Sequence, residues 1–194
     1  MDLCDLKEQI PWITDPAREW LDSHIRADMA VFEWGTGGST LFYARNTKHV
    51  VSVEHDPEWS DAVRQALDQA KITNCDYWLV RPQPCRLAPF VPYTSRTYVS
   101  RTFPEYARLL FRDYVRKLDE HPDRFFGLIV VDGRARAACL RHAVAKVRSG
   151  GYVMLDNSER PLYRHAMDFL SRFPRLDFFG DRPRLAEGWM TTVL

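Results

Sequence analysis

A short apolar run breaks into a glycine-rich turn at residues 31–39, Val31-Phe32-Glu33-Trp34-Gly35-Thr36-Gly37-Gly38-Ser39. A second apolar run, Val50-Val51-Ser52-Val53, ends in the carboxylate Glu54. This order of strand, glycine turn, helix, strand and acid is typical of a parallel α/β sheet that holds a nucleoside cofactor. Glycine lets the backbone approach a ligand where a side chain would collide, and a carboxylate can accept hydrogen bonds from both ribose hydroxyls. The sequence therefore predicts a nucleoside site at this turn.

Apolar runs of four to six residues alternate with helical periodicity along the rest of the chain, as in a doubly wound α/β sheet. The predicted strands are 30–34, 49–54, 76–80, 126–131, 151–155, 175–180 and 188–194. The predicted helices are 16–28, 38–46, 57–70, 104–120, 134–148 and 160–172. Asp132 and Asp156 each follow a strand, at the carboxyl edge where ligands bind in open α/β sheets.

Length and composition favour one domain over residues 1–194, because 194 residues with 45% hydrophobic content suit one well-buried core. No stretch approaches the roughly 18 apolar residues of a membrane span. The start, Met1-Asp2-Leu3-Cys4-Asp5, is acidic where a secretory signal is basic and then apolar. These features predict a cytoplasmic protein that does not enter a membrane. The four cysteines are scattered and suggest neither a zinc site nor a disulfide framework.

The charge is divided unevenly along the chain. Residues 1–80 hold 7 Lys and Arg against 14 Asp and Glu, whereas residues 81–194 hold 20 against 12. One interpretation is a solvated surface; the other is an anionic acceptor or partner on the arginine-rich half. Nucleic-acid binding is not expected, because a pI near 7.7 and the absence of a dense basic stripe with interleaved aromatics argue against it.

Residues 81–103 form a proline- and aromatic-rich stretch that is long for a loop in a compact domain. Such a loop is usually functional, and the aromatic residues argue against disorder. If the strand predicted at 76–80 is correct, this loop leaves from the ligand edge of the sheet. We predict a lid or substrate-recognition role; the alternative is a role in packing or in an oligomer contact, and the choice between a monomer and a homodimer stays open.

The glycine turn departs from a dinucleotide-binding fingerprint, because Thr40 stands at the third glycine position and the acid Glu33 lies two residues before Gly35. This acid-x-Gly-x-Gly form resembles motif I of class I S-adenosylmethionine-dependent methyltransferases. Two further segments look like strands four and five of that family, Val130-Val131-Asp132-Gly133 and Ser149-Gly150-Gly151 through Asp156-Asn157. The resemblance covers about residues 30–158 and implies a Rossmann-like fold with a seven-stranded, mostly parallel sheet, helices on both faces and a closing strand hairpin.

The resemblance also implies a set of cofactor-binding residues. The turn would line the methionine part of S-adenosylmethionine, Glu33 would lie near its amino group, and Glu54 would hold the ribose. His55 and Asp56 would flank the adenine, although Asp56-Pro57 could equally cap the following helix. Asp132 would lie at the edge that faces the transferred methyl group. The cofactor set predicted in this way is Glu33, Gly35, Thr36, Gly37, Gly38, Glu54, His55 and Asp132.

The closest motif pattern is that of the catechol O-methyltransferase-like branch, in which acids after strands four and five bind a divalent cation. Asp132, Asp156 and Asn157 match those positions and would hold Mg²⁺ or another divalent cation that lowers the pKa of the acceptor hydroxyl. In metal-free relatives, such acids cap the next helix or position the substrate. For a general base the candidates are Asp132, His142 and His165.

These residues predict an S-adenosylmethionine-dependent methyltransferase that acts on a small-molecule acceptor, with a hydroxyl as the expected methylated group. The Asn/Asp-Pro-Pro-aromatic motif of DNA amino-methyltransferases is replaced here by Asp132-Gly133-Arg134. Two alternatives stay open: a protein or carbohydrate acceptor, and a non-catalytic binding subunit that keeps the fold.

Overall fold

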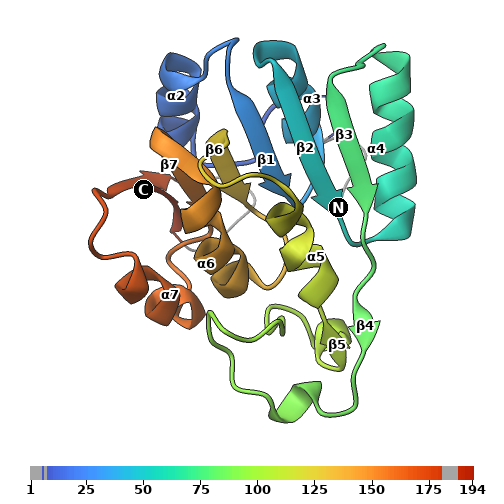
Figure 1. The fold of residues 1–194 in the computed structure, drawn as a ribbon, viewed down its shortest axis with the longest axis vertical. Helices are drawn as coiled ribbons and strands as arrows, with labels where there is room; N and C mark the ends of the chain where they lie inside the picture. Colours follow the sequence, from blue (N-terminus) through green and yellow to red (C-terminus); the bar gives the residue numbers. More distant parts are fainter. Residues whose placement is uncertain (1–5, 7, 181–187) are drawn as a thin grey trace.

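A seven-stranded sheet forms the centre of the molecule in a computed structural model that describes residues 6, 8–180 and 188–194 (Figure 1). Its strand order is β3-β2-β1-β6-β7-β9-β8. The first five strands pair in parallel, and β9 is antiparallel to both of its neighbours. The strands are β1 (Ala30–Trp34), β2 (His49–Glu54), β3 (Cys75–Leu79), β6 (Phe126–Val131), β7 (Val147–Asp156), β8 (Leu176–Gly180) and β9 (Trp189–Val193). The predicted sheet, including its closing hairpin, is confirmed.

Helices cover both faces of the sheet because successive strand residues point to opposite sides. Val31 and Val50 pack with the helices of one face, whereas Phe32 and Val51 pack with those of the other. The first face carries α2 (Asp15–His24), α3 (Gly38–Asn46) and α4 (Pro57–Gln69), and the second carries α5 (Arg112–Arg116), α6 (Arg136–Lys146) and α7 (Arg164–Phe169). No helix of the described residues has both the length and the apolar character to cross a membrane.

The predicted helix over 104–120 is wrong. The segment contains a 3-10 turn, η2 (Pro104–Tyr106), the short strand β5 (Leu109–Leu110), α5 and a second 3-10 turn, η3 (Lys117–Glu120). The physical reason is that β5 pairs antiparallel with β4 (Gln83–Pro84), so backbone groups needed for a continuous helix are used in this two-stranded sheet. The other predicted boundaries differ from the observed ones by at most four residues; for example, β7 begins at Val147, inside the helix predicted at 134–148.

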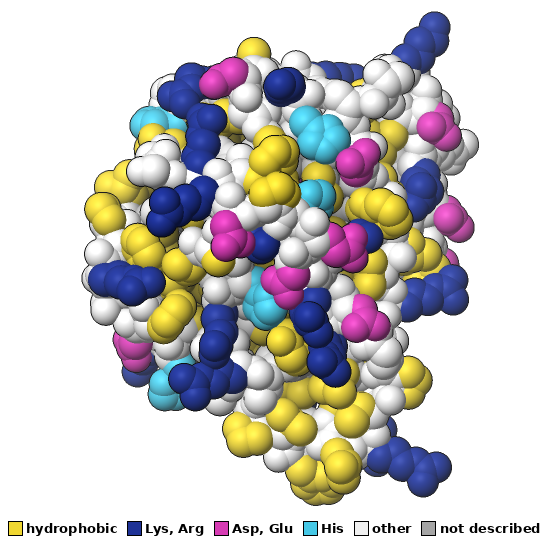
Figure 2. Space-filling model, viewed as in Figure 1, with side chains coloured by type: hydrophobic (Ala, Val, Ile, Leu, Met, Phe, Trp, Pro, Cys, Tyr) yellow, Lys and Arg dark blue, Asp and Glu magenta, His cyan; other side chains and the backbone are white. Residues whose placement is uncertain are grey.

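The long loop is an ordered extension beyond the carboxyl ends of β1, β2 and β3 (Figure 1). Arg101 braces it, with Nη2 donating to the carbonyl oxygens of Ala88 and Val91, each at 2.7 Å. The short turn η1 (Ala88–Phe90) forms its tip, where Phe90 is 82% exposed. Figure 2 shows hydrophobic side chains gathered at this end of the molecule. The loop therefore leaves from the ligand edge, as expected, while its lid role stays a prediction.

Candidate active site

Two backbone turns meet at the carboxyl edge of the sheet. Gly35 lies directly after β1 with φ +87°, and a Cβ atom on it would lie 2.8 Å from the nitrogen of Gly133, in the turn after β6. The nitrogen of Gly35 donates to the carbonyl of Val53, and that of Asp132 donates to the carbonyl of Trp34, both at 3.0 Å. This close approach explains why glycine is required in the first turn.

Glu33 lies beneath the glycine turn and is fully buried. Its two carboxylate oxygens accept hydrogen bonds from the hydroxyls of Ser52 at 2.7 Å and Ser39 at 2.9 Å. Burial raises the pKa of Glu33 to about 7, because these hydrogen bonds offset only part of the loss of hydration. A group that titrates near neutrality therefore lies directly under the predicted methionine site.

The pKa of Glu33 predicts a pH-dependent stability. Between the ordinary value of 4.5 and about 7, the folded protein keeps a proton that the unfolded chain has released. The stability from Glu33 is therefore full at low pH and is lost as the pH rises towards 7, by about 1.4 kcal/mol per pH unit at most. Urea unfolding from about pH 5 to 8 should show this slope in the wild type relative to Glu33→Gln, which does not titrate. A constant difference between the two proteins would contradict it.

Glu54 ends β2 and holds the glycine turn in place. Its Oε2 accepts hydrogen bonds from the nitrogen of Thr36 at 3.2 Å and from its hydroxyl at 2.9 Å. Its Oε1 accepts from the nitrogens of His55 at 2.7 Å and Asp56 at 2.9 Å. Burial alone would raise the pKa of Glu54, but His55 and these backbone donors lower it below its ordinary value. The predicted ribose acid is therefore ionised and lies beside the turn.

The two residues after Glu54 have different environments. His55 pairs through Nδ1 with Glu54 at 2.6 Å, and its Nε2 lies 3.1 Å from the hydroxyl of Tyr106, in η2. His55 thus connects the cofactor edge to the end of the long loop. Asp56 is the N-cap of α4 and accepts a hydrogen bond from the nitrogen of Trp59 at 3.0 Å. Of the two interpretations of Asp56, the helix cap is confirmed.

A small hollow of about 80 Å³ opens beside the glycine turn. Its walls combine the turn with aromatic side chains and one carboxylate: Ile10, Trp12, Thr36, Gly37, Gly38, Ser39, Trp59 and Asp132. The indole nitrogen of Trp59 donates to the carbonyl of Thr36 at 2.7 Å, which fixes that wall. The hollow is smaller than the roughly 300 Å³ at which small-molecule pockets begin. A nucleoside cofactor would therefore require the surrounding side chains to open.

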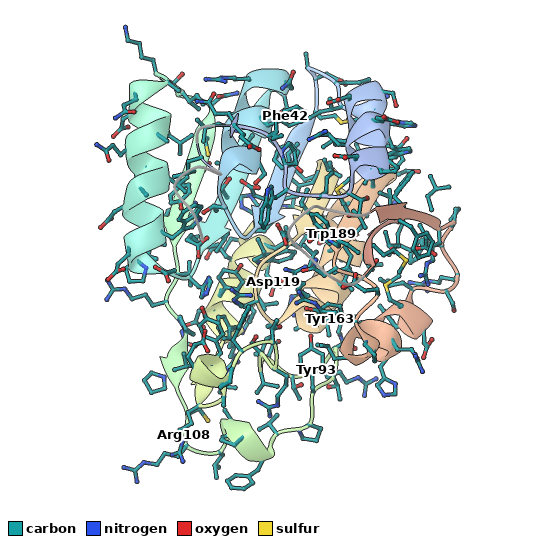
Figure 3. The ribbon with its side chains drawn as sticks, turned by 180° about the vertical axis from the view of Figure 1, so that it is seen from behind. Phe42, Tyr93, Arg108, Asp119, Tyr163 and Trp189 are labelled. Atoms are coloured by element: carbon teal, nitrogen blue, oxygen red, sulfur yellow. The ribbon has the colours of Figure 1, made fainter. Side chains whose placement is uncertain are left out.

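Arg136, in the first turn of α6, lies between the two acids that follow β6 and β7. Its Nη2 donates to Asp132 Oδ1 at 2.8 Å, and its Nε donates to the carbonyl of Gly133 at 3.0 Å. Its Nη1 donates to the carbonyl of Asp156 and lies 3.8 Å from Oδ2 of the same residue. The ring of Tyr163, which is labelled in Figure 3, has its centre 6.0 Å from the guanidinium carbon. Arg136 is only 5% exposed, and its guanidinium joins the two strand ends.

Asp156 is held by neutral donors as well as by Arg136. Its Oδ1 accepts hydrogen bonds from the indole nitrogen of Trp189 at 2.8 Å and from the hydroxyl of Thr191 at 2.9 Å, both on β9. Burial raises the pKa of Asp156 well above its usual range, and the charge of Asp132 raises it further. Asp156 therefore supports the closing hairpin and is not open to solvent.

The residues predicted to bind a divalent cation, Asp132, Asp156 and Asn157, do not fit that role. The guanidinium of Arg136 occupies the space between the two carboxylates, and a second cation there would be repelled by it. Across the described ranges, no three His, Cys, Asp or Glu side chains are grouped to hold a metal. Arg136 is absent from the predicted site. The sequence did contain an indication of this contact. Arg136 lies four residues after Asp132 near the start of a helix, a spacing that can bring the two side chains together.

The structure does not bring the predicted base His142 to Asp132. His142 lies on α6, six residues beyond Arg136, or about 9 Å along the helix. Its Nδ1 pairs with Asp119 of η3 at 2.7 Å, and its Nε2 lies 3.4 Å from the hydroxyl of Tyr98. These contacts fasten α6 to η3 and the long loop. The other histidine candidate, His165, is exposed on α7.

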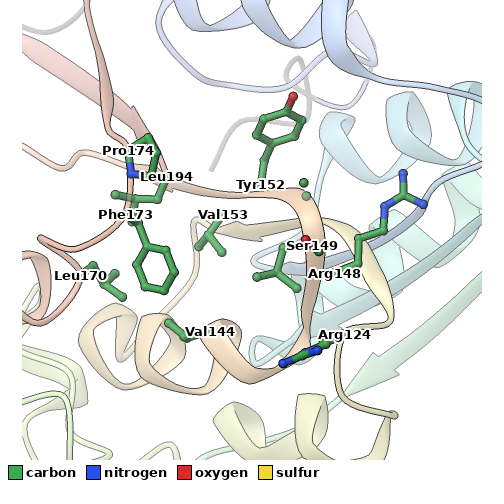
Figure 4. Close-up of a pocket in the computed structure, with 13 residues that line it drawn as sticks. Arg124, Val144, Arg148, Ser149, Tyr152, Val153, Leu170, Phe173, Pro174 and Leu194 are labelled. Atoms are coloured by element: carbon green, nitrogen blue, oxygen red, sulfur yellow. The ribbon is translucent and has the colours of Figure 1, made fainter.

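A larger cavity of about 610 Å³ lies at the opposite edge of the sheet, where β7 begins (Figure 4). Apolar side chains from α6, β7 and the end of α7 line much of it, including Val144, Val153, Leu170 and Phe173. None of the predicted cofactor, metal or catalytic residues lines this cavity. It is therefore separate from the candidate active site.

No protein-family model and no curated protein matches the chain. Solved structures do match it along nearly its whole length. An O-methyltransferase from Bacillus cereus in complex with SAH shares 15% identity over 98% of this chain and 87% of that one, with a TM-score of 0.66. A rRNA methylase from Streptococcus thermophilus shares 11% identity, covering 94% and 98%, with a TM-score of 0.60. A precorrin 8w decarboxylase from Methanobacterium thermoautotrophicum shares 16% identity, covering 96% and 92%, with a TM-score of 0.57.

The fold is therefore that of the class I S-adenosylmethionine-dependent methyltransferases, as the sequence predicted. One of the similar structures is a decarboxylase, so the chemistry of this chain has to be argued from its own site.

Proposed function

We propose that this protein is an S-adenosylmethionine-dependent methyltransferase. The observation that carries the proposal is the clustering of Glu33, the Gly35 turn and Glu54 at one sheet edge, with the nitrogen and hydroxyl of Thr36 bonded to Glu54. This cluster lies on a fold shared with a methyltransferase that was solved with SAH. A second turn, that of Asp132, meets the first, as expected if cofactor and acceptor bind next to each other.

We propose distinct roles for the residues around the turn. Gly35, Thr36, Gly37 and Gly38 would line the methionine part of the cofactor. Glu33 would face its amino group, Glu54 its ribose hydroxyls, and His55 its adenine. The cofactor supplies an activated methyl group, and the main task of the protein is to place a nucleophile in line with it. Shielding by Trp59 and by the loop residue Tyr106 would keep water from that position.

Asp132 is our candidate for contact with the acceptor. About a third of its side chain is exposed, and no hydrogen bond to its Oδ2 is found within the described part of the chain. Burial raises its pKa, whereas the charges of Arg136, Arg134 and Arg160 lower it, and the balance leaves it above the ordinary value. A carboxylate of this kind could orient an acceptor hydroxyl or take up its proton.

The acceptor that these surroundings favour is a small anionic molecule with a hydroxyl group. Arg134 stacks on two aromatic rings, one at the end of the long loop and one in η2. Its guanidinium carbon lies 4.6 Å from the ring centre of Phe103 and 5.0 Å from that of Tyr106. An arginine fixed in this way is suited to bind carboxylate or phosphate. A protein or carbohydrate acceptor is the alternative, and a non-catalytic binding subunit is the rival from another class.

Calorimetry with S-adenosylhomocysteine and with NAD tests the cofactor. We expect the sulfur nucleoside to bind and to raise the melting temperature, with about 2.7 kcal/mol of stabilisation at a hundredfold excess over its Kd. NAD should do neither. Binding of NAD, without binding of S-adenosylhomocysteine or S-adenosylmethionine, would refute the proposal. Transfer of a labelled methyl group to any member of a panel of hydroxy acids would exclude the binding-subunit rival.

A further inference from the structure

We infer that Arg136 stands in the place that the catechol O-methyltransferase-like pattern gives to a divalent cation, and that it fixes Asp132 without a metal. The inference rests on the proposed function and deepens it. The nitrogens of its guanidinium are bonded to the two strand ends, so we treat Arg136 as a positioning residue that acts through Asp132.

The guanidinium of Arg136 is saturated with hydrogen bonds. All three of its nitrogens donate to the two strand ends: Nε to the carbonyl of Gly133, Nη1 to the carbonyl of Asp156, and Nη2 to Asp132. Nη2 also donates to the carbonyl of Asp132 at 2.6 Å. The planar guanidinium thereby joins the turn after β6 to the end of β7. The compact ammonium group of a lysine could not make this set of contacts. This is the bridging task that a metal performs between acids on neighbouring strands.

The guanidinium also balances the charge of the two acids. Asp132 follows β6 and Asp156 ends the adjacent β7, so the two carboxylates share one largely buried space. Two buried carboxylates repel each other, and a cation between them reduces that repulsion. Arg136 supplies that cation from inside the fold. A metal could enter only if the guanidinium left, and an expelled guanidinium would give up four hydrogen bonds.

The contacts of Arg136 with the two strand ends form a clamp that leaves part of Asp132 available. Arg136 binds Oδ1 of Asp132 at 2.8 Å, while the same carboxylate keeps about a third of its side chain exposed on the side of the glycine turn. A carboxylate held at one oxygen can receive an acceptor hydroxyl at the other in a fixed direction. Orientation of the acceptor, which a metal achieves by direct coordination, is here assigned to Asp132.

Paramagnetic resonance of Mn²⁺ tests the inference without knowledge of the acceptor, because bound Mn²⁺ loses the signal of the free ion. The wild type should leave the signal unchanged. Arg136→Ala should uncover an oxygen site for Mn²⁺ and so reduce the signal of the free ion. Adding Asp156→Asn to Arg136→Ala should abolish that binding. Arg141→Ala, which removes an exposed arginine of the same helix, is the matched control and should behave as the wild type.

Each outcome has a defined meaning. Mn²⁺ binding by the wild type that Asp156→Asn removes would overturn the inference, because the metal would then coexist with or displace Arg136. A folded Arg136→Ala protein that does not bind Mn²⁺ would overturn it as well. If that variant does not fold, Arg136→Gln replaces it, and a melting temperature that Mn²⁺ raises in either variant but not in the wild type would support the inference; no such rise would refute it. Binding of S-adenosylhomocysteine by the wild type is measured separately, so failure of the proposed function remains distinguishable.

Discussion

Replacing Gly35 with alanine is expected to lower the free energy of unfolding by about 3 kcal/mol or more and to abolish cofactor binding. Two effects add. The backbone of Gly35 has φ +87°, a conformation that alanine adopts only with strain. The new Cβ would also lie 2.8–2.9 Å from backbone atoms of Asp132 and Gly133, which cannot move aside as a flexible side chain could. Urea denaturation followed by circular dichroism measures the loss.

Gly37→Ala is the matched control for this prediction. Gly37 lies in the same turn, but a Cβ there would meet only the ring of Trp59 at 3.5 Å, an ordinary contact. Its stability should therefore stay within about 1 kcal/mol of the wild type. Because Gly37 lines the hollow beside the turn, the control variant can still lose affinity for S-adenosylhomocysteine. Equal stability of the two variants would show that the contact between the two turns does not hold the fold together.

The sheet was predictable because its strands are apolar runs whose order along the chain leaves few topologies. The position of the site was predictable as well. Gly35 and Asp132 follow strands and Glu54 ends one, and parallel strands bring their carboxyl ends to one edge. The structure confirms that edge. The cofactor roles, the single-domain organisation and the cytoplasmic location remain predictions.

Two differences from the structure show what sequence patterns leave out. The helix predicted at 104–120 has suitable periodicity, but Leu109 and Leu110 instead pair with Gln83 and Pro84, a contact over more than twenty residues that local periodicity does not report. The structure does not support the predicted metal site, because the pattern of acids was considered without the cation beside it. Arg136 is four residues from Asp132, yet its reach to Asp156 depends on the parallel pairing of β6 with β7. The spacing along the chain indicates the contact of Arg136 with Asp132, whereas the contact with Asp156 follows only from the fold.

Glu54→Gln is expected to weaken binding of S-adenosylhomocysteine about 10- to 150-fold, or about 1.5–3 kcal/mol, through loss of charge-assisted hydrogen bonds. In the free protein, Thr36, His55 and Asp56 already donate four hydrogen bonds to the Glu54 carboxylate, which has about four acceptor positions. A ribose hydroxyl must therefore displace one donor. The hydroxyl of Thr36 is the donor best placed to leave, because it also lies 2.9 Å from the hydroxyl of Tyr77.

Asp56→Asn provides the control for Glu54→Gln, since asparagine caps a helix as well as aspartate and the α4 cap should survive. Its affinity should equal that of the wild type. A comparison of methylthioadenosine with its 2′-deoxy analogue then separates a ribose contact from local damage: the hydroxyl should contribute to binding in the wild type and contribute little in Glu54→Gln. If the 2′-hydroxyl contributes equally in both proteins, the ribose acid lies elsewhere. Thr36 and Glu54 would then form a structural brace of the glycine turn through the two hydrogen bonds between them.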